Sequence, residues 1–279
     1  MPTTPMTEPQ DSPSPSSVEI WKERLLRAFL DTWRGLEHCL QPVSTDPSGD
    51  EGQITDDQAS GYRTLVVLMM GLMVGWWLYV PLHELLHAAG CLWTGGEVTR
   101  LEIARAYGGD LYAALFDFVV PESEYAGRLS GFSTFGNDGI YLATDLAPYV
   151  LTVFPGVYAL RRSVAAGRPF LYGFWLSFAL APFISISGDA YEIGSIVVTW
   201  LPLWAEHAEL LRSDDLFLWI DTHQGRSGVP WAGAALATFL GLIWAWGTYA
   251  LGSLLSCRLG YGPIQAWMPA EQSEDQATP

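Results

Sequence analysis

The stretch VPLHELLH, residues 80–87, places three ionisable side chains at the end of an apolar segment. Residues 64–82 carry no charge, and these 19 residues are close to the ~20 that a helix needs to cross the hydrocarbon core of a bilayer. Ionisable side chains at membrane depth are costly and usually mark a function. We therefore interpret residues 64–82 as a first membrane span, with His83, Glu84 and His87 as candidate functional residues.

The three residues form the pattern H-E-x-x-H. Side chains four positions apart lie on one face of a helix, so the imidazoles of His83 and His87 can bind one zinc ion. Zinc lowers the pKa of bound water to about 7, and a neighbouring carboxylate can take the proton and pass it to a leaving amine. The spacing predicts zinc ligation by His83 and His87, with Glu84 as general base and acid.

The composition is that of a membrane protein. Hydrophobic residues make up 49% of the chain and charged residues only 16%, too few charges for a water-facing surface. Further apolar stretches cover residues 140–160, 169–188 and 227–257, and the third resumes over 193–205. We predict an all-α polytopic membrane protein with about four spans, integral to a lipid bilayer, which would be the cytoplasmic membrane in a bacterium. The net charge of −16 argues against nucleic acid, which requires a basic face.

Composition also divides the chain outside the spans. Residues 1–16 are rich in Pro, Ser and Thr and predict a disordered tail. Residues 17–41 repeat apolar side chains at three- and four-residue steps, which predicts an amphipathic helix, and its mixed charges favour packing on the protein over lying on a membrane surface. Residues 42–62 resemble a linker, residues 63–258 the membrane domain, and residues 259–279 a flexible tail.

A small β element is predicted after the first span. Residues 97–119 alternate in polarity on both sides of Gly108-Gly109. This pattern predicts a β-hairpin that turns at the two glycines.

The motif in its setting resembles a known family. HELLH at the end of a membrane helix, followed by Gly95-Gly96 and a sheet-like segment, is similar to the site-two proteases, which are intramembrane zinc metalloproteases. The resemblance covers about residues 64–205 and is most specific at residues 83–87. It implies a zinc endopeptidase that cuts membrane-embedded or membrane-proximal proteins in regulated proteolysis. A hairpin beside the site would suit this reaction, because a sheet edge holds a substrate segment extended.

The resemblance also implies a third zinc ligand. The family uses an aspartate beside a small residue in a later membrane helix, and Ser187-Gly188-Asp189-Ala190 offers Asp189. Asp145, a lone acid in the second predicted span, is the rival ligand. Asp189 and Glu192 could instead form a capping box for a helix. Glu192 could also be a ligand, or support Asp189 through a hydrogen bond.

Other polar residues have plainer interpretations. Cys91 lies one helical turn beyond His87, where packing is favoured over ligation. The chain has three cysteines, too few for a disulfide framework. Asn137 lies between glycine turns and could donate to an oxyanion, but a turn is favoured. His207, Asp221 and His223 predict a solvated connection.

Two functional alternatives and the topology remain open at this stage. The chain could be a protease-like protein that binds partner helices without catalysis, or a carrier that uses Asp145 and Asp189 as proton sites. It could also be a membrane zincin with a glutamate as third ligand. Basic residues near the span ends divide five against five. Those of residues 17–41 favour a cytoplasmic N-terminus, whereas the resemblance favours a cytoplasmic zinc site, and the oligomeric state is not indicated.

Overall fold

A computed structural model describes residues 22–41 and 54–266 of the chain. Within these ranges, four helical stretches are long and apolar enough to cross a membrane: Ser60–Trp93, Asp138–Ala165, Pro169–Ser187 and Trp231–Arg258. This agrees with the predicted helical protein of about four spans and is compatible with a multi-pass membrane protein. The predicted tail at 1–16 and residues 42–53 of the predicted linker lie outside the described residues, as does the end of the last segment, 267–279.

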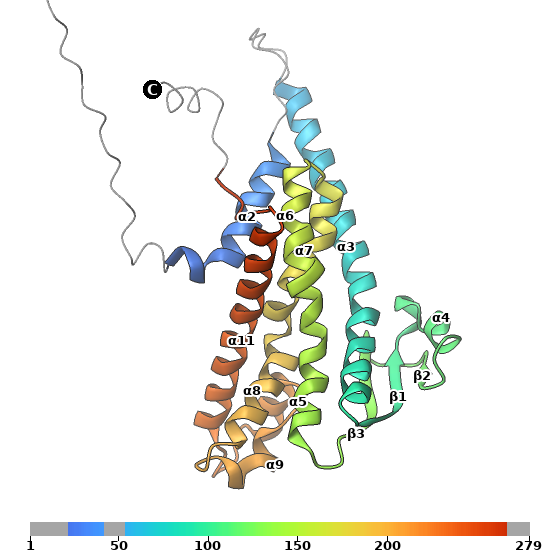
Figure 1. Ribbon diagram of the computed structural model, residues 1–279, viewed down its shortest axis with the longest axis vertical. Coiled ribbons are helices and arrows are strands. Elements are labelled where there is room, and N and C mark those ends of the chain that lie inside the picture. The colour runs from blue at the N-terminus through green and yellow to red at the C-terminus, as the bar shows by residue number, and fades with distance from the viewer. Residues whose placement is uncertain (1–21, 42–53, 267–279) are drawn as a thin grey trace, which may run out of the picture.

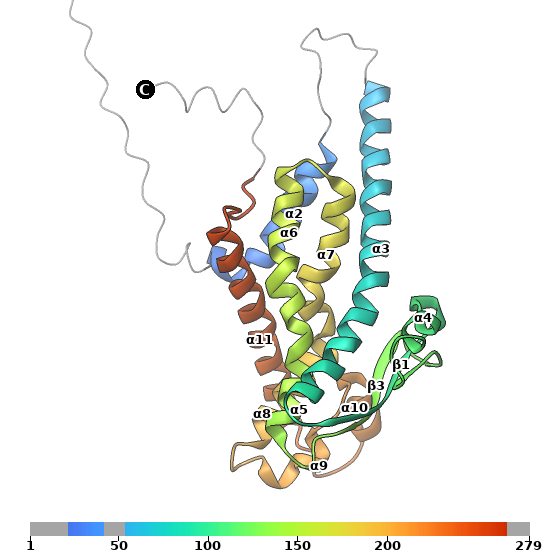
Figure 2. The ribbon, with the colours of Figure 1, turned by 45° about the vertical axis from the view of Figure 1, so that its right-hand side comes forward.

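The helices form an elongated bundle (Figures 1 and 2). We call one end the α2 end, where α2 and the start of α3 lie, and the other the sheet end, where the sheet, α9 and α10 lie. In chain order the helices are α2 (Arg27–Leu40), α3 (Ile54–Trp93), α4 (Gly109–Ala113), α5 (Asp138–Leu146), α6 (Val157–Ala165), α7 (Pro169–Ile184), α8 (Asp189–Thr199), α9 (Ala208–Leu211), α10 (Leu216–His223) and α11 (Trp231–Arg258). The last residues of the predicted linker, 54–62, are therefore helical and begin α3.

Glycines bring α3 and α7 into close contact. A Cβ atom at Gly71 would overlap the backbone carbonyl of Phe170, and one at Gly75 would overlap that of Phe174. Membrane helices pack closely where small residues recur every fourth position, because their backbones can then approach. The pattern Gly71-x-x-x-Gly75 thus fixes how α3, which carries the H-E-x-x-H motif, lies against α7.

The third apolar stretch is interrupted. α7 ends at Ile184, a 3-10 turn covers Ser185–Ser187, and α8 starts at Asp189. α8 then packs closely against α11, because Gly194 and Gly241 leave room for the backbones of Ala237 and Ala190. The interruption places the start of α8 inside the bundle.

The β element is a three-stranded sheet in the order β2-β1-β3. β1 (Glu97–Ile103) pairs in antiparallel register with β3 (Gly127–Ser133) and in parallel with the short β2 (Val119–Val120). The predicted strand at the start of 97–119 is confirmed, but its predicted hairpin partner is wrong. After Gly108-Gly109 the chain forms the short helix α4, because an alternation over five residues also fits a single helical turn and β3 occupies the antiparallel edge of β1.

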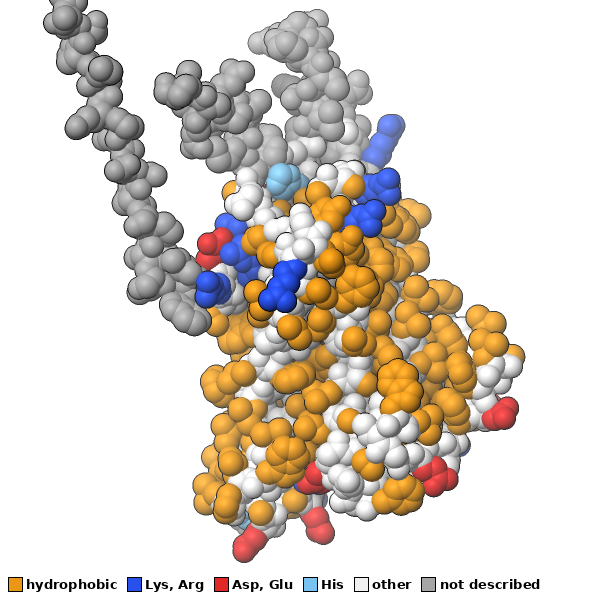
Figure 3. Space-filling view, in the orientation of Figure 1, with side chains coloured by type: hydrophobic (Ala, Val, Ile, Leu, Met, Phe, Trp, Pro, Cys, Tyr) orange, Lys and Arg blue, Asp and Glu red, His pale blue; other side chains and the backbone are white. Residues whose placement is uncertain are grey.

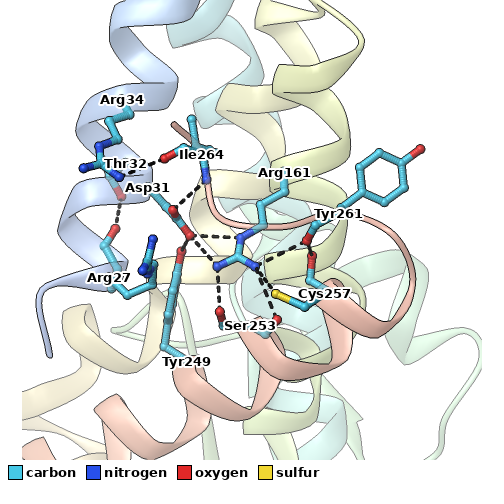
Figure 4. A network of polar contacts seen from close by, with 12 residues as sticks. Arg27, Asp31, Thr32, Arg34, Arg161, Tyr249, Ser253, Cys257, Tyr261 and Ile264 are labelled. Atoms are coloured by element: carbon cyan, nitrogen blue, oxygen red, sulfur yellow. Dashed lines mark hydrogen bonds and ion pairs between the residues drawn. The ribbon is translucent and has the colours of Figure 1, made fainter. Parts of the chain in front are cut away.

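The amphipathic helix predicted within 17–41 packs on the bundle as α2 (Figure 4). Asp31 is fully buried and pairs with Arg161 of α6, whose Nη2 lies 2.7 Å from Oδ2 of Asp31. The hydroxyl of Tyr249 and the backbone N–H of Ile264 donate to the same carboxylate at 3.0 and 3.1 Å. The network joins α2, α6, α11 and the segment after α11.

Charge and apolar surface separate along the bundle (Figure 3). On the face shown, orange apolar side chains cover the middle, Lys and Arg gather towards the α2 end, and most Asp and Glu lie towards the sheet end. An apolar belt between two charged ends is the surface that a bilayer-spanning bundle needs.

Candidate metal centre

The H-E-x-x-H motif lies on α3 near the sheet end, as its helical spacing predicts. His83 and His87 occupy the same side of the helix, with their Nε2 atoms 3.0 Å apart. The imidazole rings stand nearly perpendicular, at 85°. The two Nε2 atoms therefore point towards one position beside α3.

Asp189 reaches this position from the first residue of α8. Its Oδ2 lies 3.0 Å from Nε2 of His83, and its Oδ1 lies 3.7 Å from Nε2 of His87. Ligand atoms of the three residues all lie within 4.8 Å of one another, and no other such group of His, Cys, Asp or Glu occurs in the described ranges. The capping-box alternative is not observed, since Gly188 occupies the cap position and no side chain caps α8.

Hydrogen bonds on the far side of the rings set the imidazoles. Nδ1 of His87 lies 2.9 Å from the carbonyl oxygen of Thr144, which can only accept, so a neutral His87 carries its proton on Nδ1 and a lone pair on Nε2. Nδ1 of His83 lies 2.8 Å from the hydroxyl of Tyr79. A fixed tautomer of this kind is the usual arrangement behind metal-binding histidines.

The donor set fits a zinc ion. The lone pair of His87 on Nε2 and the buried Oδ2 of Asp189 each lie 3.0 Å from Nε2 of His83. Either a proton on His83 or a cation must separate these groups, because lone pairs repel. Two imidazole nitrogens and one carboxylate oxygen are a ligand set that zinc uses in catalytic sites, where a fourth position stays open.

Glu84 lies against the sheet. A Cβ atom at Gly127, the first residue of β3, would lie 2.5 Å from Cγ of Glu84. The carboxylate is half-buried and borders the same cavity as His87 and Asp189. Sequence reasoning missed Gly127, although a glycine in a strand often marks the close approach of another group.

A cavity of about 490 Å³ opens beside Glu84 and two of the candidate ligands, His87 and Asp189. Phe132, Phe217 and Leu218 give it apolar walls, and Gly127, Arg128 and Leu129 line it along β3. β3 pairs with β1 on one side only and is an edge strand of the described sheet. An extended peptide in the cavity would therefore meet an edge strand that can pair with it.

Asp145 and Glu192 line the cavity without joining the ligand group. Asp145 is 3% exposed, and Glu192 accepts a hydrogen bond from the hydroxyl of Tyr141. Burial raises the pKa of Glu192 to about 8, although the hydrogen bond from Tyr141 acts in the opposite direction. The geometry thus favours Asp189 over both rivals as third ligand.

The remaining candidates lie apart from the ligand group. Cys91 is buried and packs near the carbonyls of Glu97 and Ser133. Asn137 caps α5 by accepting from the backbone of Gly139 at 2.8 Å, so the turn interpretation is confirmed.

The connection predicted to be solvated is partly helical. Asp221 and His223 belong to α10, and His223 stacks on Trp219 with ring centres 4.9 Å apart. His207 ends a short 3-10 helix and is half-buried.

Comparison of the chain with models of known protein families, with curated proteins and with solved structures found no match.

Proposed function

We propose that this protein is an intramembrane zinc metalloendopeptidase that hydrolyses peptide bonds in membrane-embedded or membrane-proximal proteins. The observation that carries the proposal is the convergence of His83, His87 and Asp189 beside Glu84, at the wall of a cavity among apolar helices. A zinc ion held by the three ligands would supply a Lewis acid and a water of lowered pKa.

Glu84 is the proton carrier in this proposal. Its carboxylate borders the cavity and follows His83 directly in the chain, so it lies beside the ligands. It takes a proton from the attacking water and delivers it to the nitrogen of the leaving amine, which a general base and acid must do in amide hydrolysis. Gly127 leaves the room that this side chain needs.

The edge of β3 would orient the substrate. A peptide bond inside a helix is hidden in the backbone hydrogen-bond ladder, and pairing with Gly127–Ser133 would hold the segment extended along the cavity. The apolar walls suit a segment that leaves the bilayer. These features favour a protein substrate over a small molecule.

The alternative zincin with a glutamate ligand has less support. Glu192 lies one turn after Asp189, but its carboxylate is engaged by Tyr141. It also lies outside the group of ligand atoms within 4.8 Å. The carrier alternative would use Asp145 and Asp189 as proton sites, and the activity of a carrier would not change in Glu84→Gln.

The test compares wild type with Glu84→Gln, both full-length and zinc-loaded in detergent. Casein and a set of fluorescent single-span peptides serve as substrates. We expect cleavage by wild type and a loss of about 10²- to 10⁴-fold in the variant, because the general base and acid is gone. Equal rates, or a folded wild type without zinc, would contradict the proposal.

A further inference from the structure

Asp145 lies on the cavity wall in α5. The residue is 3% exposed, its Oδ2 accepts no hydrogen bond, and it borders the cavity. A buried carboxylate is costly unless it is paired. An unpaired buried carboxylate beside an open cavity therefore indicates that a bound ligand supplies its partner.

Of the six acids that line the cavity, two have a close partner and two belong to the proposed reaction. Asp214 pairs with Arg128 at 2.8 Å, and Asp215 caps α10 by accepting from the backbone of Leu218 at 2.9 Å. Asp189 belongs to the metal ligands, and Glu84 is the proposed proton carrier. Neither Asp145 nor Glu192 forms an ion pair with a Lys or Arg in the described ranges, although the charge of Arg128 acts on Glu192 through space.

Arg128 cannot neutralise both remaining acids. It is the one Lys or Arg among the described residues that line the cavity, and its Nη2 already pairs with Asp214. Glu192 receives only the neutral hydroxyl of Tyr141. One positive charge bound between Asp145 and Glu192 would therefore stabilise the ionised form of both carboxyl groups.

The place of Asp145 relates it to the proposed reaction. The backbone carbonyl of the preceding residue, Thr144, accepts the hydrogen bond that orients His87. Asp145 is therefore the next residue in the chain after the one that orients this candidate metal ligand. The ring of Phe132 also lines the cavity and packs on Tyr141. Aromatic walls suit the methylene stem of a long cationic side chain.

We propose that Asp145 and Glu192 form a subsite that binds a lysine or arginine side chain of the substrate, next to the bond that is cut. The inference rests on the proposed function and specifies its substrate class. A guanidinium or ammonium group would donate to the free Oδ2 of Asp145 and form a charge-assisted hydrogen bond. A second metal ion is less well supported, because no metal-binding group that includes these acids occurs among the described residues.

Binding of a pair of matched compounds tests the subsite without catalysis. The probes are peptide hydroxamates that carry lysine or norleucine, which lacks only the ammonium group. We expect zinc-loaded wild type to bind the lysine compound at least about tenfold more tightly. Asp145→Asn and Glu192→Gln should each remove this preference, and Asp221→Asn, an exposed acid of α10, should keep it.

Cleavage of a peptide library provides the second readout. Mass spectrometry of the products of wild type is expected to show Lys or Arg enriched at one position near the cut, and Asp145→Asn is expected to lose this enrichment. Cleavage that needs Glu84 but shows no basic preference would overturn the subsite and leave the proposed function standing. A preference for the lysine compound in binding, without any cleavage, would overturn the proposed function and leave the basic subsite standing.

Two further outcomes decide against the subsite. Equal binding of the two hydroxamates by wild type overturns it without recourse to any variant. Loss of a bound divalent ion in Asp145→Asn, with the metal at the histidines retained, would assign the acids to a metal site instead. If Asp145→Asn does not fold, Glu192→Gln and the wild-type comparison still decide the result.

Discussion

Asp189 lies with its Oδ2 3.0 Å from Nε2 of His83, so the first residue of α8 meets the C-terminal part of the first candidate span. This contact depends on the interruption between α7 and α8, which starts a new helix inside the bundle. A metal ion at this point would join α3 to α8. A bound metal would therefore couple the candidate site to the packing of the bundle.

The ligand set predicts metal content. His87→Ala and Asp189→Ala should each reduce zinc from about one ion per chain to a small fraction, because three protein ligands are needed to hold it. Glu192→Gln should keep the metal, and this difference would show that Asp189 rather than Glu192 is the ligand in α8. Mass spectrometry of the metal in detergent-purified protein measures this, and Asp221→Asn is the control. Zinc retained in Asp189→Ala would exclude Asp189 as a ligand.

Gly127 predicts a loss of catalysis that does not involve the metal. Gly127→Ala places a Cβ atom 2.5 Å from Cγ of Glu84 and must displace that side chain. Because a displacement of about 1 Å can cost about 10²-fold in rate, we expect a large fall in cleavage with zinc content unchanged. Gly247→Ala is the matched control, since no atom lies near a Cβ at that position. Full activity in Gly127→Ala would show that Glu84 needs no such room.

The buried ion pair predicts how α2 contributes to stability. Asp31→Ala leaves Arg161 buried without its partner and should lower the free energy of unfolding by about 3–5 kcal/mol. Glu23→Ala removes a partly exposed partner of Arg27 and should cost less than about 1 kcal/mol. Denaturant titration in detergent compares the two. A similar small loss in both variants would mean that α2 is not held by Asp31.

The docked α2 predicts the membrane orientation. Together with the residues just before it, α2 brings four basic residues to an end of the bundle whose elements already carry five, against five at the sheet end. Lys22, Arg24, Arg27 and Arg34 join Arg63, Arg161, Arg162, Arg168 and Arg258, opposite Arg100, Arg105, Arg128, Arg212 and Arg226. Basic residues favour the cytoplasmic side, so we expect the α2 end there and the metal site nearer the opposite surface.

Labelling of single cysteines with an impermeant maleimide in intact cells measures this orientation, in a chain whose own cysteines are replaced. Ser227→Cys at the sheet end should react from outside. Ala166→Cys, in the turn between α6 and α7, should react only after the membrane is opened. The inverse result would place the metal site on the cytoplasmic side, as the resemblance to site-two proteases implies.

The features that could be predicted from sequence depend on neighbours along the chain. Hydropathy is a sum over adjacent residues, so the four candidate spans were predicted near their observed positions. Helical periodicity places His83 and His87 on one face whatever the rest of the chain does. The strand at 97–103 and the amphipathic helix were also predicted from local patterns.

Packing between distant segments decided the rest. The sequence by itself determined a helical chain with membrane-length apolar segments and two histidines and a glutamate on one helix, because those properties follow from local periodicity and composition. The resemblance already favoured Asp189 over Asp145 and Glu192, but only the tertiary structure brought Asp189 to the two histidines, paired β1 with β3, and buried Asp31 against Arg161. Each of these depends on which backbones approach closely, and that is set by contacts such as Gly71 with Phe170, which no local pattern specifies.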